Sequence, residues 1–265
     1  IVIAKVDVAA FQDGTGPLGV RQLQKMNITK VKAPKSIFFL DHAAPSPRRE
    51  LSNDHMLLRE FSKQAGAILS EVGEGVIHQR LVESFAKPGD VVIGGDSHTC
   101  TSGALGAFAT GMGSTDVAIG MAIGKTWFKV PETIRIEVNG KFQTGVFSKD
   151  LILYLIGMIG ADGATYKALE FGGRTIDNMS MESRFVLSNM AVEAGAKVGL
   201  IASDRVTREY LKARGRLKDW RPLAPDMDAN YEKVIKIDVA KIEPQVAFPH
   251  TVDNTRPISS AKGKN

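Results

Sequence analysis

Short apolar runs alternate along the chain with longer segments whose apolar residues recur at helical spacing. Several of the short runs are apolar throughout, as in a parallel sheet that is covered on both faces. Strands are expected at residues 1–10, 36–40, 91–93, 133–138, 166–171, 197–202 and 231–239. Helices are expected at residues 17–26, 51–65, 114–125, 149–159 and 180–193. Strands that alternate with helices predict an α/β protein with mainly parallel sheets.

The clearest break in this pattern is near Val130-Pro131. We therefore expect a first domain at residues 1–130 and a second at residues 131–265. Within the second domain, Asn139-Gly140 follows the alternating strand at 133–138 and predicts a hairpin turn.

The composition is that of a globular protein, with 43% hydrophobic and 24% charged residues. The net charge of +5 is spread along the chain without interleaved aromatic residues, so no nucleic-acid partner is expected. A mildly basic protein suits small anionic substrates. The longest apolar run, Leu151–Gly160, is too short to cross a bilayer, so no membrane partner is expected either. The chain starts at an isoleucine and ends in a loop-like segment, and we expect it to be a piece of a longer polypeptide.

Cys100 is the single cysteine among 265 residues. It excludes an intrachain disulfide and a site built from several cysteines of this chain. A reducing, cytoplasmic setting is expected. We interpret Cys100 as a small buried residue at a crowded turn.

Candidate chemistry gathers in the stretch Asp90–Ala118, where the strand at 91–93 stops at two glycines. Asp96, Ser97 and His98 follow directly. In open α/β sheets, ligands bind outside the carboxyl ends of the strands.

Two further histidines, His42 and His78, also stand at breaks beside apolar elements, and Asp41 precedes His42. A carboxylate stabilises a protonated imidazole, so such pairs suit proton delivery to a leaving hydroxyl near neutral pH. We therefore predict an acid–base site at this edge of the sheet. His55, among polar neighbours in a helix, is predicted to be a surface residue, and the role of His250 stays open.

Two familiar motifs are rejected. Residues 120–126 (GMAIGKT) resemble a phosphate-binding loop but are one residue short between the glycines, and the lysine stands late in a helix. No Gly-x-Ser-x-Gly elbow of an α/β hydrolase is present.

The run Gly95-Asp96-Ser97-His98-Thr99, followed by glycines, resembles the signature of the aconitase superfamily. Four other segments agree in the superfamily's order, namely residues 11–13 (FQD), 40–42 (LDH), 75–79 (GVIHQ) and 188–196 (SNMAVEAGA). Residues 95–118 and 248–254 most resemble the large subunits of 3-isopropylmalate dehydratases and the closely similar homoaconitases. The resemblance implies two α/β/α three-layer domains with mainly parallel sheets, and a third domain that is largely absent from this chain.

The resemblance also implies roles for individual residues in a hydro-lyase of leucine biosynthesis. Three acid–imidazole pairs match catalytic positions: Asp41 with His42, His78 with Asp96, and His98 with Glu193. Gln12 and Ser97 match substrate contacts, and Asn189 matches a residue beside the cofactor.

The superfamily's cofactor is a [4Fe–4S] cluster, one iron of which acts as a Lewis acid on an anionic, malate-type substrate. Its cysteines stand in a Ser-Cys-Thr-Asn motif and a later Cys-x-x-Cys, and neither is present here. No metal ligand is therefore expected in this chain. The catalytic serine belongs to a swivelling domain, which a small-subunit partner carries, so this chain alone is expected to be inactive. One alternative is a homoaconitase or another dehydratase of the same family. A further alternative is a cluster-free binding relative that has lost catalysis.

Overall fold

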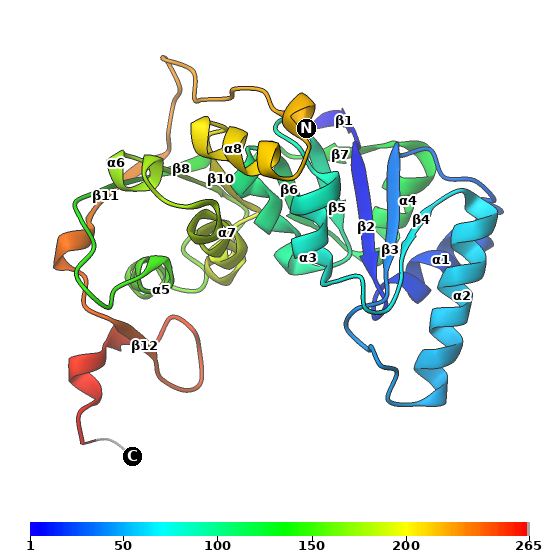
Figure 1. Ribbon diagram of the computed structural model, residues 1–265, viewed down its shortest axis with the longest axis horizontal. Helices are drawn as coiled ribbons and strands as arrows, with labels where there is room; N and C mark the ends of the chain where they lie inside the picture. Colours follow the sequence, from blue (N-terminus) through cyan, green and yellow to red (C-terminus); the bar gives the residue numbers. More distant parts are fainter. Residues whose placement is uncertain (264–265) are drawn as a thin grey trace. The chain divides into compact units, whose positions relative to one another are not determined.

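The computed structural model describes residues 1–263, which divide by their internal contacts into two compact units (Figure 1). The first unit comprises Ile1–Thr99 and Ala107–Val130, and the second comprises Cys100–Gly106 and the residues from Pro131 onward. Each unit is built on a parallel sheet with helices, which confirms the predicted α/β class.

The first unit contains a five-stranded sheet in the order β4-β3-β2-β5-β6, and every neighbouring pair is parallel. Its strands are β2 (Val8–Gln12), β3 (Lys35–Phe39), β4 (Ile68–Ser70), β5 (Val91–Gly94) and β6 (Phe108–Gly111). All five strands therefore end at the same edge of the sheet.

Helices cover both faces of this sheet. The helices α1 (Gly16–Lys25), α2 (Arg49–Ala65) and α4 (Ser114–Ile123) lie on one face, where they share a buried core with Phe11 and Phe38. Alternate strand residues point to the opposite face, since side chains alternate along a strand. There Phe39 meets Phe85 edge to face, with ring centroids 6.2 Å apart. Phe85 ends the π-helical turn Leu81–Phe85, which continues α3 (Ile77–Arg80), so the first unit has three layers.

A small antiparallel pair, β1 (Val2–Lys5) with β7 (Lys125–Phe128), accompanies this sheet. The predicted strand at 1–10 is thus two strands, β1 and β2. The predicted helix at 114–125 ends at Ile123 because Gly124 adopts a left-handed conformation with φ of 71°.

The second unit has a four-stranded parallel sheet in the order β10-β9-β8-β11. Its strands are β8 (Thr133–Asn139), β9 (Ala168–Gly172), β10 (Val198–Ile201) and β11 (Lys233–Asp238). Its helices are α5 (Ser148–Ile159), α6 (Arg174–Asp177), α7 (Met181–Met190) and α8 (Arg205–Ala213). A separate antiparallel pair, β12 (Gln245–Ala247) with β13 (Thr255–Pro257), follows the sheet. Short 3₁₀ turns occupy Ser97–Leu105, Ala191–Ala194, Leu217–Asp219, Val239–Lys241 and Ile258–Ala261.

The predicted hairpin at Asn139-Gly140 is wrong. Strand β8 has only parallel partners in the described sheet, β9 and β11. Gly140 supplies the positive φ of 94°, and its carbonyl accepts a hydrogen bond from Oγ1 of Thr175 at 2.8 Å. The dipeptide therefore turns the chain toward α5.

The segment Cys100–Gly106 belongs to the second unit, although residues 1–130 were predicted to form the first domain. Its glycines permit this packing, because a Cβ atom on Gly103 would lie 2.1 Å from the carbonyl oxygen of Gly199. Across residues 1–263, we find no helix with both the length and the apolar character needed to span a membrane.

Candidate active site

Acidic residues follow three neighbouring strands of the first sheet. Asp13 comes directly after β2, Asp41 stands two residues after β3, and Asp96 stands two residues after β5. Because these strands are parallel neighbours, their carboxyl ends bring the three carboxylates to one edge. Four imidazoles complete what we call the histidine–aspartate cluster: His42, His55, His78 and His98.

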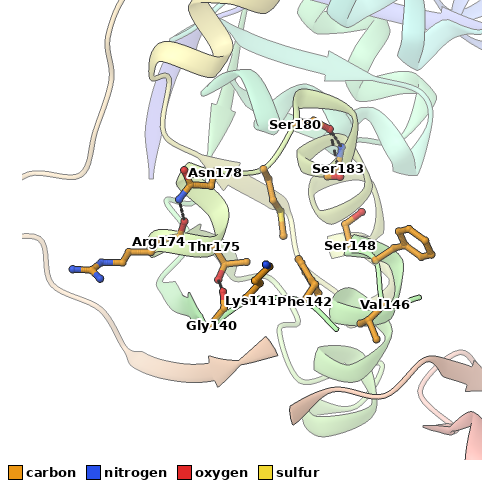
Figure 2. Close-up of a pocket in the computed structure, with 12 residues that line it drawn as sticks. Gly140, Lys141, Phe142, Val146, Ser148, Arg174, Thr175, Asn178, Ser180 and Ser183 are labelled. Carbon is orange, nitrogen blue, oxygen red and sulfur yellow. Dashed lines mark hydrogen bonds between the residues drawn. The ribbon is translucent and has the colours of Figure 1, made fainter. Parts of the chain in front are cut away.

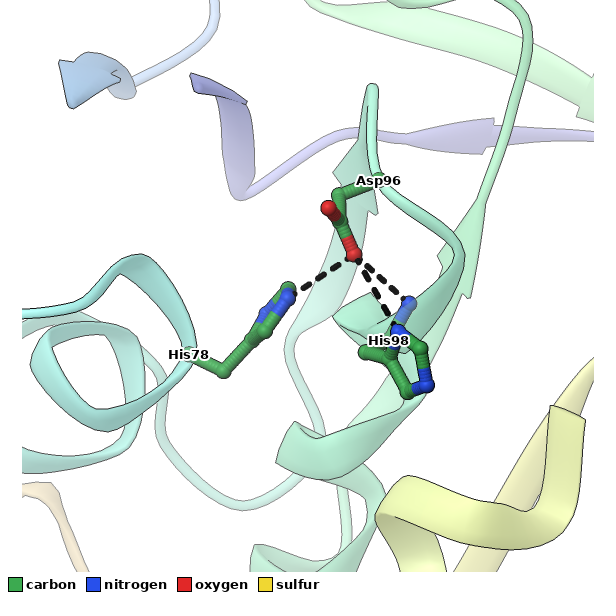
Figure 3. Close-up of side chains that lie close together, drawn as sticks. All are labelled: His78, Asp96 and His98. Atoms are coloured by element: carbon green, nitrogen blue, oxygen red, sulfur yellow. Dashed lines mark hydrogen bonds and ion pairs between the residues drawn. The ribbon is translucent and has the colours of Figure 1, made fainter. Parts of the chain in front are cut away.

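Asp96 is the centre of this cluster. Its Oδ1 atom lies 2.8 Å from Nε2 of His78 and 3.7 Å from Nδ1 of His98, and it accepts the backbone N–H of His98 at 2.8 Å. Figure 3 shows the two rings approaching the same carboxylate, His78 from a helix and His98 from the segment after β5. The other oxygen, Oδ2, lies 3.4 Å from Nε2 of His42. One carboxylate thus holds three imidazoles that are far apart in sequence.

Asp41 connects His42 to the helix that carries His78. Its Oδ1 atom lies 3.0 Å from Nδ1 of His42. Its Oδ2 atom accepts the backbone N–H of Ile77 at 2.8 Å, at the start of α3. The carboxylate is nearly buried, whereas the His42 ring is 42% exposed and can meet a molecule in solution.

Asp13 fixes the loop that carries His42. Its Oδ1 atom accepts the backbone N–H of His42 at 3.0 Å, and its Oδ2 atom accepts that of Ala43 at 2.9 Å. Oδ2 also lies 2.8 Å from Nε2 of His55 on α2. Asp13 was not predicted to be a site residue, although its place after a strand matches that of Asp41 and Asp96.

The prediction that His55 is a surface residue is wrong. The residue is 4% exposed and lies on the buried face of α2 together with Leu58 and Ser62. Its polar sequence neighbour Asp54 lies on another face of the helix, where it pairs with Arg21 at 2.7 Å. The helical spacing of His55 from Leu58 and Ser62, rather than its adjacent residues, was the informative signal.

The carboxylates control protonation in this cluster. Burial alone would lower the pKa of His42, but the hydrogen bond with Asp41 and the negative charges of Asp41, Asp96 and Asp13 outweigh it and raise the pKa above 6.5. Burial would raise the pKa of Asp96, but its hydrogen bonds with His78 and His98 hold that pKa well below its usual range. Asp96 is therefore a carboxylate at neutral pH, and His42 retains its proton more readily than a free imidazole.

The other predicted site residues occupy defined places. Gln12 ends β2, is 8% exposed, and its Oε1 atom accepts the backbone N–H of Gly14. Ser97 is exposed, and its hydroxyl lies 3.3 Å from Nδ1 of His98. Asn189, in the second unit, donates through Nδ2 to Oγ1 of Thr101 at 2.9 Å. Glu193 lies in the 3₁₀ turn Ala191–Ala194 of the same unit. The functional roles of these four residues, and the pairing of Glu193 with His98, stay predictions.

Cys100 is 1% exposed, and its thiol donates to the carbonyl oxygen of Asn189 at 3.3 Å. This confirms the interpretation of a small buried residue. A [4Fe–4S] cluster with three protein ligands needs three thiolates, and this chain has one cysteine. The residues of this chain therefore do not fit the cluster by themselves.

Two groups in the first unit bring metal-ligating atoms within 4.8 Å of one another: His78, Asp96 and His98, and Asp13, Asp41 and His42. In the second group, the oxygens of Asp13 already accept two backbone N–H groups and meet His55. In the first group, one oxygen of Asp96 serves both histidines. Hydrogen bonds and ion pairs account for the closeness of the side chains in both groups. Both groups are therefore described as acid–base pairs.

Comparison with known sequences defines the class of protein. The profile of the aconitase family (aconitate hydratase) matches residues 1–265, so the chain belongs to the aconitase family. This confirms the resemblance on which the residue roles were predicted.

Among curated relatives, a 3-isopropylmalate dehydratase large subunit from Elusimicrobium minutum is 63% identical over 262 residues, which cover 98% of this chain and 63% of the relative. The 3-isopropylmalate dehydratase large subunit 1 of Thermotoga maritima is 55% identical, over 99% of this chain and 63% of the relative. The large subunit 2 of Archaeoglobus fulgidus is 54% identical, with the same two coverages. The chain thus spans 63% of the length of these relatives.

Proposed function

We propose that the protein carrying this chain is a hydro-lyase that moves a hydroxyl group between adjacent carbons of a malate-type acid, by dehydration and rehydration. The observation that carries this proposal is the carboxylate of Asp96, which lies within 3.7 Å of imidazole nitrogens of His42, His78 and His98. Loss of water requires a proton for the departing hydroxyl, and imidazoles held by carboxylates supply one near neutral pH.

The names of the relatives favour 3-isopropylmalate and 2-isopropylmalate as the two compounds that are interconverted. This reaction belongs to leucine biosynthesis, and we place it in the cytoplasm. Three relatives at 54% identity or more carry the name 3-isopropylmalate dehydratase large subunit. Homoaconitase chemistry is the alternative that the sequence left open.

In this reaction His42 is the proton donor to the leaving hydroxyl. Its ring is partly exposed at the sheet edge, and Asp41 and Asp96 favour its protonated form. Asp41 also fixes the orientation of the ring, because its carboxylate accepts a hydrogen bond from Nδ1 of His42. The other ring nitrogen, Nε2, is then directed toward Asp96 and the substrate. Buried Asp13 holds the backbone of the same loop, so the ring is presented in one orientation.

His78 and His98 are the second set of proton carriers, both held on Asp96. Glu193 is proposed as the further partner of His98, by its match to the family. Gln12 and Ser97 are proposed substrate contacts, and Asn189 a neighbour of the cofactor. Residues 1–130 and 131–265 are proposed as the two family domains.

The cofactor of this activity is proposed to be the family's [4Fe–4S] cluster. Its thiolate ligands would come from outside residues 1–265. Cys100 is the single cysteine of these residues, and its thiol donates to the carbonyl oxygen of Asn189. A small subunit with the swivelling domain is the proposed partner, in keeping with the words "large subunit" in the names of the relatives.

The test uses the full-length protein with its cluster and small subunit, supplied with isopropylmaleate or with homoaconitate. We expect hydration of isopropylmaleate, and a fall in kcat of about 10²- to 10⁴-fold in His42→Asn. Preference for homoaconitate would select the alternative substrate. If neither compound is hydrated by the cluster-loaded wild-type protein, the proposal is wrong and a non-catalytic relative is favoured.

A further inference from the structure

A cavity of about 570 Å³ opens in the second unit, at the carboxyl end of β8. It shares no residue with the histidine–aspartate cluster. Figure 2 shows that its wall combines the loop after β8, the start of α6, and the starts of α5 and α7. Its lining includes Lys141, Phe142, Ser148, Met179, Ser180 and Ser183.

The cavity lies where the order of strand addition in this sheet reverses. Strand β8 is the first of the sheet in the chain, and it pairs with β9 on one side and β11 on the other. Loops that leave a sheet to its two sides at such a point diverge, and α/β proteins bind ligands in the crevice between them. Gly140 and Lys141 follow β8 directly and line the cavity.

Two helices of ordinary length begin at this cavity. The helix α5, of 12 residues, starts at Ser148, and α7, of 10 residues, starts at Met181 after Ser180. A helix N-terminus presents backbone N–H groups and a partial positive charge, which favour an anion. At α7 one of these groups is already satisfied, since Oγ of Ser180 accepts the N–H of Ser183 at 3.3 Å. Asp150 of α5 does not line the cavity, because its oxygens accept the N–H groups of Phe147 and Gln245 at 2.8 and 2.7 Å.

Ser148 is an independent indication of a ligand. It is 8% exposed, lines the cavity, and its hydroxyl forms no hydrogen bond with any residue in the described range 1–263. The residue is nearly buried, but its hydroxyl is not among the fully buried polar atoms without a partner, so this oxygen reaches the open space of the cavity. Water or a polar group of a ligand can satisfy it there. Thr175, which is equally buried in the same wall, is instead satisfied by the Gly140 carbonyl.

The charges of the wall are positive. Lys141 and Arg174 line the cavity, and within residues 1–263 no acidic side chain does. Neither cation forms an ion pair within residues 1–263. Figure 2 shows the Lys141 side chain between Thr175 and Phe142, whereas Arg174 extends outward at the rim. The remaining wall is largely apolar, with Phe142, Val146 and Met179.

We propose that this cavity binds a small organic anion, with its acidic group at Lys141, Ser148 and the first turns of α5 and α7, and its apolar body against Phe142 and Met179. A phosphoryl or sulfonyl group on an aromatic or branched aliphatic body has this chemistry. The proposal concerns the second unit alone and does not depend on the dehydratase activity.

The test is calorimetric titration of the full-length protein with phenyl phosphate, and separately with inorganic phosphate. We expect saturable binding of phenyl phosphate that is tighter than that of inorganic phosphate, because the ring adds apolar contact. Lys141→Gln should weaken it roughly tenfold, as expected for the loss of one charge-assisted contact. Ser148→Ala should also weaken it. Lys149→Gln is the matched control, since this exposed neighbour carries the same charge and does not line the cavity.

Three results would overturn the proposal. The first is the absence of saturable binding to the wild-type protein at millimolar phenyl phosphate. The second is equal weakening by Lys141→Gln and Lys149→Gln, which would indicate a diffuse charge effect. The third is unchanged affinity in both Lys141→Gln and Ser148→Ala, with unfolding midpoints showing that each variant is folded.

Discussion

The Oδ2 atom of Asp13 lies 2.8 Å from the Nε2 atom of His55, and both side chains are shielded from solvent. The pair joins the end of β2 to α2 in the first unit. Since the same carboxylate accepts the backbone N–H groups of His42 and Ala43, this buried contact also determines where His42 stands.

Replacement of Asp13 by asparagine is therefore expected to destabilise the fold. The amide group can satisfy at most part of the three N–H contacts, and a buried polar group left without its hydrogen-bond partner costs about 1 to 3 kcal/mol. Urea denaturation measures the change in the free energy of unfolding. Asp54→Asn is the matched control, because its surface pair with Arg21 contributes less than about 1 kcal/mol. Equal effects of the two variants would contradict the supporting role of Asp13.

The His42 imidazole should titrate above pH 6.5, because its pKa is raised by Asp41, Asp96 and Asp13 in spite of burial. The folded protein binds this proton more tightly than the unfolded chain. The resulting stabilisation is therefore present below pH 6.5 and is lost as the pH rises through the folded-state pKa.

An NMR titration of the His42 ring protons measures this pKa directly. In Asp41→Asn the midpoint should fall, since the hydrogen bond and one negative charge are removed while burial remains. Glu60→Gln, at an exposed position on α2, is expected to leave the midpoint unchanged. A wild-type midpoint below 6.5 would exclude the proposed stabilisation of the imidazolium.

His98→Ala should reduce the hydration of isopropylmaleate by the full-length protein by about 10²- to 10⁴-fold in kcat, as expected for the loss of a general acid or base. The visible absorbance of the proposed cluster should not change, because the role proposed for His98 is proton transfer. His250→Ala, at an exposed loop position, is the control. Wild-type turnover in His98→Ala would remove this residue from the mechanism.

Cys100→Ser should leave unchanged the absorbance of the cluster proposed for the full-length protein. The thiol is buried and donates to the Asn189 carbonyl, and a serine hydroxyl can make the same contact. Absorbance per mole of protein, measured after identical reconstitution of both proteins, is the readout. A loss of one quarter or more of the iron in Cys100→Ser would contradict the assignment of Cys100 as a structural residue.

The sequence predicted the long elements well because their periodicity is strong. The helix predicted at 51–65 is observed at Arg49–Ala65, and the apolar strand predicted at 36–40 is observed at Lys35–Phe39. Short strands such as β6 and β7, of four residues each, were missed, since so few residues show no clear periodicity.

The wrong predictions have a common cause: contacts between residues distant in sequence cannot be read from the adjacent residues. Asn139-Gly140 has the chemistry of a hairpin turn, but the partners of β8 are distant strands and Thr175 holds the turn. The polar neighbours of His55 concealed its buried helical face. Asp13 was passed over because it has no adjacent histidine, and its partner His55 is 42 residues away.

The meeting of His42, His78, His98, Asp41 and Asp96 could be predicted in outline, because residues after parallel strands share an edge. The sharing of one Asp96 carboxylate by three rings could not, since it depends on where α3 places His78. The catalytic roles of these residues remain predictions that the variants above will test.

Within residues 1–263, every ion pair of Asp13, Asp41 and Asp96 is with a histidine, and none is with lysine or arginine. A lysine or arginine would keep the charge of the sheet edge constant, whereas the charge of an imidazole can change near physiological pH. Protonation of His42 therefore reduces the net negative charge of this edge and its repulsion of an anion. Under the proposed function, binding of the dicarboxylate substrate should accordingly depend on pH.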